Sequence, residues 1–144
     1  MKTLGIIPAR YASSRFPGKP LIDLNGKSMI QRVYEQACKA SLLAQVVVAT
    51  DDQRIFDHVV GFGGKAVMTS SEHRSGTDRC AEVLSKTTQH VDAVINIQGD
   101  EPFIQPEQID FLAKLFEDDS VEIGTLIKPL HDAADLSNPN IIKV

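Results

Sequence analysis

The sequence predicts an α/β fold, in which helices cover both faces of a doubly wound, mostly parallel β-sheet. Short apolar segments rich in β-branched residues alternate with longer amphipathic segments along the chain. This alternation is typical of repeated strand–helix units, which form parallel sheets through right-handed crossovers. The chain has 144 residues, a length that suits one domain, so we expect residues 1–144 to form a single α/β domain.

Five segments are predicted to be strands because they are mostly apolar and β-branched, as strands covered on both faces are. They are residues 3–7, 45–50, 65–68, 91–97 and 122–127, the last interrupted by Gly124. Residues 141–144 have the pattern of the beginning of a further strand. We therefore expect the chain to be truncated at its carboxyl end.

Four helices are predicted, each beginning at a polar cap or a proline. The expected starts are Ser28, Asp51 or Asp52, Thr77 and Pro106. Ser28 and Gln31 have the spacing of a capping box, and the glycine-rich residues 61–64 end the second helix. Cys38 and Cys80 fall on apolar faces of the first and third helices, so both are expected to be buried free thiols in a reducing compartment.

The positive charge of the chain is concentrated near its amino terminus. Residues 1–20 contain four cationic side chains and no acid, whereas the whole chain has a formal charge of −4. A cationic loop on an acidic protein is a candidate site for a polyanionic substrate such as a triphosphate. The acidic balance argues against a nucleic-acid partner.

Several familiar functional patterns are missing from the sequence. The four histidines form no zinc-binding pair, Gly18-Lys19-Pro20 lacks the spacing of a Walker A loop, and no G-x-G-x-x-G follows a predicted strand. No apolar run approaches the length of about 20 residues that a membrane span needs. We therefore expect a cytoplasmic protein without stable membrane insertion.

Two loops at carboxyl ends of predicted strands carry unusual chemistry. Arg10, Arg15 and Lys19 follow the first strand, and Gln98 and Asp100 follow the strand at 91–97. If the strand order is 3-2-1-4, these two strands are adjacent and their loops converge where open α/β sheets bind ligands. Cations facing a carboxylate suit a phosphate–Mg²⁺ site, because Mg²⁺ prefers one or two carboxylates together with phosphate oxygens.

The residues of these loops resemble the signatures of one enzyme family. Residues 7–21 read Ile-Pro-Ala-Arg-Tyr-Ala-Ser-Ser-Arg-Phe-Pro-Gly-Lys-Pro-Leu, residues 73–79 read His-Arg-Ser-Gly-Thr-Asp-Arg, and residues 98–102 read Gln-Gly-Asp-Glu-Pro. Together with Ala-Thr-Asp-Asp at 49–52 and Asn-Pro-Asn at 138–140, they are similar to the 3-deoxy-manno-octulosonate (Kdo) cytidylyltransferases, or CMP-Kdo synthetases. The resemblance covers essentially the whole chain and implies a Rossmann-like nucleotidyltransferase fold.

The resemblance also implies a reaction and a set of site residues. CTP and Kdo would give CMP-Kdo and pyrophosphate, with Mg²⁺ as cofactor, for lipopolysaccharide biosynthesis. Arg10, Lys19 and Asp100 would be catalytic, with Asp100 holding the metal. The residues implied to bind the nucleotide are Pro8, Ala9, Arg10, Arg15, Lys19, His73, Ser75 and Gln98. For Ser75 the alternative is a plain helix cap.

The chain departs from this family in length, because its members continue beyond residue 144. The resemblance implies that the missing part carries the sugar-binding and dimerisation regions, and that full-length members are homodimers. Two alternatives to a complete Kdo enzyme stay open. One is a CTP-binding fragment without turnover, and the other is a cytidylyltransferase for another sugar acid, such as 8-amino-Kdo or sialate.

Overall fold

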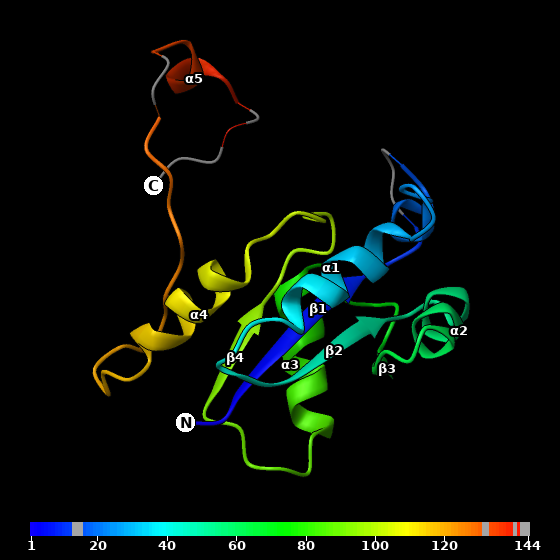
Figure 1. The fold of residues 1–144 in the computed structure, drawn as a ribbon, viewed down its shortest axis with the longest axis horizontal. Coiled ribbons are helices and arrows are strands. Elements are labelled where there is room, and N and C mark those ends of the chain that lie inside the picture. Colours follow the sequence, from blue (N-terminus) through cyan, green and yellow to red (C-terminus); the bar gives the residue numbers. More distant parts are fainter. Residues whose placement is uncertain (13–15, 131–132, 140, 142–144) are drawn as a thin grey trace.

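A four-stranded parallel sheet with strand order β3-β2-β1-β4 forms the centre of the protein (Figure 1). The computed structural model describes residues 1–12, 16–130, 133–139 and 141. The strands are β1 (Thr3–Ala9), β2 (Leu43–Thr50), β3 (Ala66–Met68) and β4 (Ala93–Asn96). The helices are η1 (Lys19–Leu21, a 3₁₀ helix), α1 (Met29–Ala37), α2 (Gln53–Gly61), α3 (Gly76–Lys86), α4 (Pro106–Leu115) and α5 (Ala133–Ser137). The predicted α/β class is confirmed, and the strand order meets the condition under which the loops after β1 and β4 converge.

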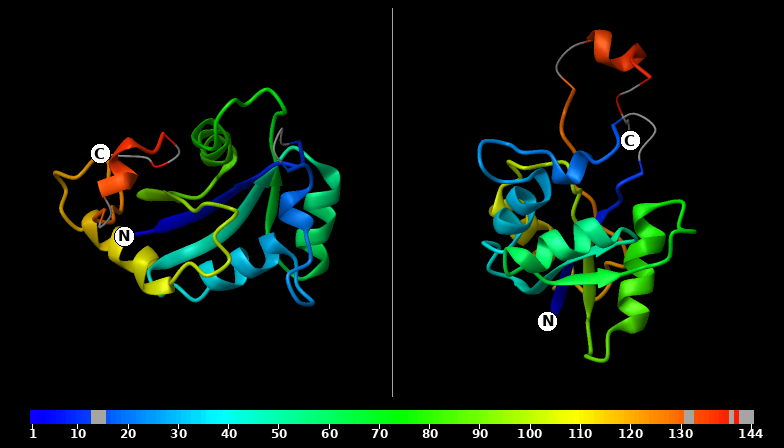
Figure 2. Two further views of the ribbon diagram at one scale, coloured as in Figure 1. Left: turned by 90° about the horizontal axis from the view of Figure 1, so that it is seen from above. Right: turned by 90° about the vertical axis from the view of Figure 1, so that its right-hand side faces the viewer.

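The two faces of the sheet are covered by different helices. Successive side chains of a strand point to opposite faces, so β1 supplies Ile7 to one cluster of buried residues and Ile6 to the other. The larger cluster joins the sheet to α1, α2 and α4, and the smaller one joins it to α3. Figure 2 shows α3 on one side of the sheet and α1 and α4 on the other. The core therefore holds β1 in the middle, with its carboxyl end free to carry a site.

The helix starts follow the predicted caps with small differences. The Ser28 hydroxyl accepts the Gln31 backbone N–H at 3.2 Å, but the Gln31 side chain donates to Glu35 and does not complete a capping box. Asp52, rather than Asp51, caps α2 by accepting the Arg54 backbone N–H at 3.0 Å. Helix α3 begins at Gly76, next to the start predicted near Thr77, and α4 begins at Pro106 as predicted.

The strand predicted at residues 122–127 is wrong. This segment is extended but belongs to no sheet, and Ile123 is 90% exposed. Its Gly124 lies against α4, since a Cβ there would be 3.2 Å from a Leu115 methyl group. A β-branched segment becomes a strand only when a neighbouring strand pairs with it, and the described chain offers none here. In the strand predicted at 141–144, residues 142–144 lie outside the described residues.

The two cysteines differ in their surroundings, which corrects the expectation that both are buried. Cys80 lies under the sheet at 5% exposure, and burial raises the pKa of its thiol to about 11. Cys38 is exposed because it is the residue that ends α1, one position beyond the buried Ala37. Both are free thiols.

The carboxyl-terminal segment leaves the body of the protein. Figure 1 shows α5 at the end of an extended stretch, apart from the sheet and from α1–α4. Among the described residues, no helix has the length and apolar character needed to cross a membrane.

Candidate functional site

Three loops meet around Pro8 at the carboxyl ends of the strands. A Cβ on Gly99, in the loop after β4, would lie 3.0 Å from the Pro8 carbonyl oxygen. A Cβ on Gly76, at the start of α3, would lie 3.0 Å from Pro8 Cγ. Contacts this short are tighter than most Cβ atoms make, so glycine is favoured at both positions. The two glycines therefore bring segments far apart in sequence to one point beside β1.

A hollow of about 170 Å³ opens beside this point. Its lining combines the end of β1, the turn before α3 and the end of β4, and consists of Pro8, Ala9, Arg10, His73, Ser75, Gly76, Arg79 and Gln98. Six of these are residues that the sequence singled out as a nucleotide site. The structure therefore brings Pro8, Ala9, Arg10, His73, Ser75 and Gln98 together, and the roles assigned to them stay predictions.

Lys19 and Asp100 face each other across the same edge of the sheet. The Lys19 ammonium donates to Asp100 Oδ2 at 2.7 Å, although 81 positions separate the two residues. Both side chains are about half exposed, at 42% and 53%. An ion pair this exposed contributes little stability, of order 0–1 kcal/mol, so a stronger ligand for either partner can replace it.

The cationic loop is anchored on α2 through an aromatic ring. The Gly18 N–H donates to the Tyr11 carbonyl at 2.9 Å, which closes the loop between them. The Arg54 guanidinium lies 3.3 Å from the centre of the Tyr11 ring and also pairs with Asp52 at 2.6 Å. Because Lys19 directly follows Gly18, this anchor also fixes the backbone position of Lys19. Arg15, predicted to bind the nucleotide, lies outside the described residues.

Arg79 is a site residue that sequence reasoning missed. It lines the hollow and is only 3% exposed. Its guanidinium donates to Asp51 Oδ2 at 3.0 Å and to the Thr69 hydroxyl, so it connects α3 to the ends of β2 and β3. In the sequence, Arg79 stood out only as the last residue of the family-like stretch at 73–79, and that stretch does not indicate that the side chain is buried.

Hydrogen bonds join the turn before α3 to the helix itself. The Ser75 hydroxyl accepts the Asp78 backbone N–H at 3.0 Å, so Ser75 is a helix cap as well as a lining residue. His73 Nε2 is hydrogen-bonded to the Glu82 carboxylate. A hydrogen bond from Lys86, then bonds from Ser70 and His73, lower the pKa of Glu82 to about 2. Glu82 is therefore ionised at neutral pH.

Asp100 is the residue of this site that suits a divalent cation. No group of three or more His, Cys, Asp or Glu side chains that could hold a metal occurs within the described ranges. A single exposed carboxylate fits Mg²⁺ when the other ligands are phosphate oxygens and water, because Mg²⁺ is usually held that way. The donor set therefore suits a metal that arrives with a phosphorylated ligand and does not suit a pre-formed metal cage.

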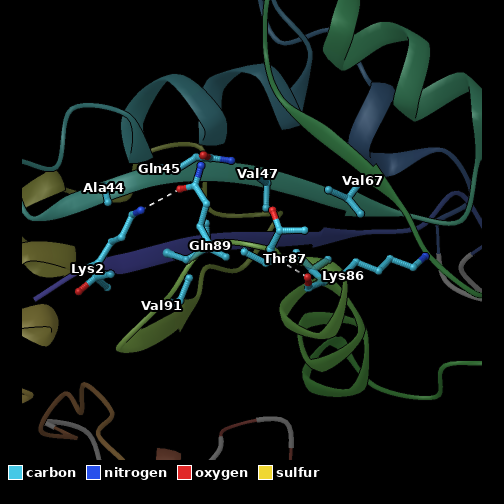
Figure 3. A pocket seen from close by; sticks show the side chains of 13 residues that line it. Lys2, Ala44, Gln45, Val47, Val67, Lys86, Thr87, Gln89 and Val91 are labelled. Atoms are coloured by element: carbon cyan, nitrogen blue, oxygen red, sulfur yellow. Dashed lines mark hydrogen bonds between the residues drawn. The ribbon is translucent and has the colours of Figure 1, made fainter.

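A second hollow, of about 230 Å³, lies at the opposite end of the strands (Figure 3). It adjoins the start of β1 and the end of α3, and its floor includes Val47 and Val83. Its lysines are already engaged, Lys2 with Gln89 at 2.8 Å and Lys86 with the Met68 carbonyl at 2.8 Å. In open α/β sheets ligands bind beyond the carboxyl ends of the strands, so we assign the site to the hollow beside Pro8.

The protein has the α/β fold of nucleotidyltransferases, and the carboxyl edge of its parallel sheet brings the Lys19 ammonium to the Asp100 carboxylate. A sequence model of the family described as cytidylyltransferase matches residues 4–144. The chain belongs to this cytidylyltransferase family.

Individual relatives agree with the family assignment. The chain is 57% identical to a 3-deoxy-manno-octulosonate cytidylyltransferase of Parabacteroides distasonis and 56% identical to one of Bacteroides thetaiotaomicron; in both cases 100% of this chain and 58% of the relative are covered. A solved structure of CMP:2-keto-3-deoxy-manno-octonic acid synthetase complexed with CTP superimposes with a TM-score of 0.80 at 50% identity, covering 84% of this chain and 50% of that one. The chain thus spans less than two thirds of the length of these relatives.

Proposed function

We propose that residues 1–144 form the CTP-binding half of a Kdo cytidylyltransferase, which transfers the cytidylyl group of CTP to Kdo and releases pyrophosphate. The observation that supports this most directly is the Lys19–Asp100 contact of 2.7 Å between the loops that follow β1 and β4, because Arg10 and Gln98 of the same two loops line the hollow next to Pro8. It brings a cation suited to phosphate and a carboxylate suited to a metal ion within hydrogen-bonding distance of each other. The relatives at 56–57% identity are the second support.

The proposed chemistry is an in-line displacement at phosphorus. The anomeric hydroxyl of Kdo attacks the α-phosphorus of CTP, a P–O bond to the sugar forms, the bond to pyrophosphate breaks, and the hydroxyl proton passes to water. Arg10 and Lys19 offset the charge on the transferred and leaving oxygens, and electrostatic stabilisation of this kind usually contributes most to the rate of such reactions. Asp100 would hold Mg²⁺. When bound, the metal ion neutralises phosphate charge and makes a nearby hydroxyl easier to deprotonate.

The Lys19–Asp100 pair would be exchanged when the ligand binds. The triphosphate offers Lys19 a stronger partner than one exposed carboxylate, because charge-assisted bonds to phosphate are short and strong. Release of Lys19 frees Asp100 Oδ2, the oxygen it occupies in the structure. The pair thus keeps both groups oriented until nucleotide and cation arrive.

The first prediction concerns Lys19. Lys19→Ala should weaken CTP binding by about 1.5–3 kcal/mol, the contribution of one charged hydrogen bond. The measurement is isothermal titration calorimetry with CTP and Mg²⁺. Lys27→Ala is the matched control, since the Lys27 ammonium pairs with Glu35 at 2.6 Å and a similar exposure of 44%. Equal CTP affinities in both variants would contradict the role of Lys19.

The second prediction concerns Asp100. Asp100→Asn should lower the effect of Mg²⁺ on CTP binding, because the amide has no charge to hold the cation. CTP affinity is measured with and without Mg²⁺ in the wild type and the variant. A Mg²⁺ dependence that is unchanged in the variant would remove Asp100 from the metal site.

Two alternatives are separated by adding the sugar acid. Since the chain spans 58% of the relatives' length, CTP binding without turnover is a specific alternative. Pyrophosphate release with Kdo would support the transferase, and binding without release would support the fragment. Release with 8-amino-Kdo or sialate instead would identify another sugar acid.

The homodimer of full-length members is part of the same proposal and is measured by light scattering. The free thiols Cys38 and Cys80 agree with a cytoplasmic setting.

A further inference from the structure

One carboxylate, Glu82, organises the turn that lines the hollow. It lies in the second turn of α3 and accepts the Ser70 backbone N–H at 2.8 Å. Lys86 pairs with it at 2.6 Å, and His73 Nε2 is hydrogen-bonded to its Oε2. His73, unlike Glu82, lines the hollow beside Pro8. Glu82 therefore acts on the site only through the imidazole that it holds.

The bond to Glu82 decides which nitrogen of His73 carries the proton. An ionised carboxylate only accepts hydrogen bonds, so His73 Nε2 must be the donor. In a neutral imidazole the other nitrogen, Nδ1, is then an acceptor. Within the described part of the chain, no hydrogen bond engages Nδ1. When it is neutral, His73 therefore has Nδ1 as its hydrogen-bond acceptor, and His73 lines the hollow.

An acceptor at this position distinguishes the two common pyrimidines. Cytosine carries an exocyclic amino group that donates, whereas the corresponding atom of uracil-type bases is a carbonyl oxygen that accepts. We propose that Glu82 is a positioning residue that makes His73 an acceptor for the exocyclic amino group of a cytosine nucleotide, and thereby favours cytosine over uracil; this inference rests on the proposed nucleotide-binding function.

Replacement of Glu82 by its amide tests the proposal. A glutamine side chain can accept a hydrogen bond from Nε2 or donate one to it. In Glu82→Gln the proton of a neutral His73 can therefore sit on either ring nitrogen. The affinities of CTP and UTP, each with Mg²⁺, are measured by calorimetry at about pH 8, where imidazoles are ordinarily neutral. The expected result is a preference for CTP over UTP in the wild type that falls by about fivefold to tenfold in the variant, the effect of one neutral hydrogen bond.

A matched control separates this role from general support of the turn. Lys86→Met removes the other ion pair of Glu82 and leaves the bond to His73, so the CTP to UTP ratio should stay unchanged. An unchanged ratio of CTP to UTP affinity in Glu82→Gln would overturn the inference about Glu82. The proposed function would still stand in that case if the wild type binds CTP. Failure of the wild type to bind either nucleotide would overturn both.

A spectroscopic measurement on the wild type covers the case in which Glu82→Gln does not fold. Nitrogen-15 NMR of the histidine rings reports directly which ring nitrogen carries the proton, and His73→Gln identifies the signal among the four histidines. The expected result is a protonated Nε2 and a bare Nδ1 that shifts when CTP is added. A proton on Nδ1, or an Nδ1 signal indifferent to saturating CTP, would overturn the inference.

Discussion

Gly18 has two separate reasons to be glycine. Its φ of +73° is in the left-handed region, and a Cβ there would lie 3.1 Å from the Tyr11 ring. Gly26 has a similar φ of +82°, but a Cβ there would meet nothing within 4 Å. Both glycines need the left-handed backbone conformation, but only Gly18 is close to another side chain. Comparing them therefore separates the cost of the conformation from the cost of the contact with Tyr11.

Both glycine variants should be destabilised, and Gly18→Ala more strongly. Gly26→Ala should cost about 1–2 kcal/mol for the left-handed conformation alone. Gly18→Ala adds the displacement of Tyr11, which carries the anchor to Arg54. Urea unfolding measures both costs. Equal costs would mean that the Tyr11 ring moves away freely.

The two thiols should react at very different rates. Burial raises the pKa of both thiols, but Cys38 is an exposed residue, whereas Cys80 is buried and its pKa is raised to about 11, so little of the reactive thiolate forms at Cys80 at neutral pH. With a thiol reagent such as Ellman's reagent, one thiol should react with the native protein and both after denaturation. Mass spectrometry identifies Cys38 as the first to react. Rapid native labelling of Cys80 would contradict its burial.

The sequence could identify site residues by type but not by their contacts. The loops of Lys19 and Asp100 were predicted to converge if the strand order was 3-2-1-4; the sheet has that order, and Lys19 Nζ lies 2.7 Å from Asp100 Oδ2. Arg79 and Glu82 were missed because a charged residue on a helix is normally solvated. Their importance comes from partners in other segments, such as Asp51 and His73, which no local pattern reveals.

At the scale of elements, Asp110 connects α4 to the turn that leads into β2. Its carboxylate accepts the Ser41 N–H at 3.0 Å, the Leu42 N–H at 2.8 Å and the Ser41 hydroxyl at 2.8 Å. Burial raises the pKa of Asp110, but these three donors outweigh it and the pKa is lowered overall. The ionised form is therefore the one that fixes the start of the longest strand.

Asp110→Asn should destabilise the fold by about 1–3 kcal/mol at neutral pH, because the amide accepts these bonds less strongly than a carboxylate. Since folding lowers the pKa, the stability that ionised Asp110 adds is present above the ordinary aspartate range. It is lost as pH falls through the lower folded pKa. The difference between wild type and variant, measured by urea unfolding, should thus shrink on acidification. A difference independent of pH would exclude the charge as its cause.

Strands and helices were predictable where their pattern agrees with their surroundings. β1 and β2 read as apolar segments and are buried on both faces, and α1, α2 and α4 show helical spacing and clear starts. The strand predicted at 122–127 failed because strand formation depends on a pairing partner, which a local pattern does not report. Helix α5 was missed because five residues are too short to show a period.

At the scale of the whole molecule, the core and the carboxyl-terminal segment are independent. Helix α5 lies apart from the sheet (Figure 1), and its Leu136 is 65% exposed. A chain that ends at Leu130 should therefore unfold at the same urea concentration as the full chain, because it keeps Gly124 against α4. A clear drop in the unfolding midpoint would show that residues 131–144 support the core.

β4 is the last strand on its side of the described sheet, with β1 as its single neighbour. Along its other side, alternate backbone amides and carbonyls of Ala93–Asn96 face outward. Such a margin is a template on which another polypeptide can add a strand. Concentrated solutions of this chain should therefore self-associate through growth of the sheet, and a lysine placed on that margin should keep them monodisperse.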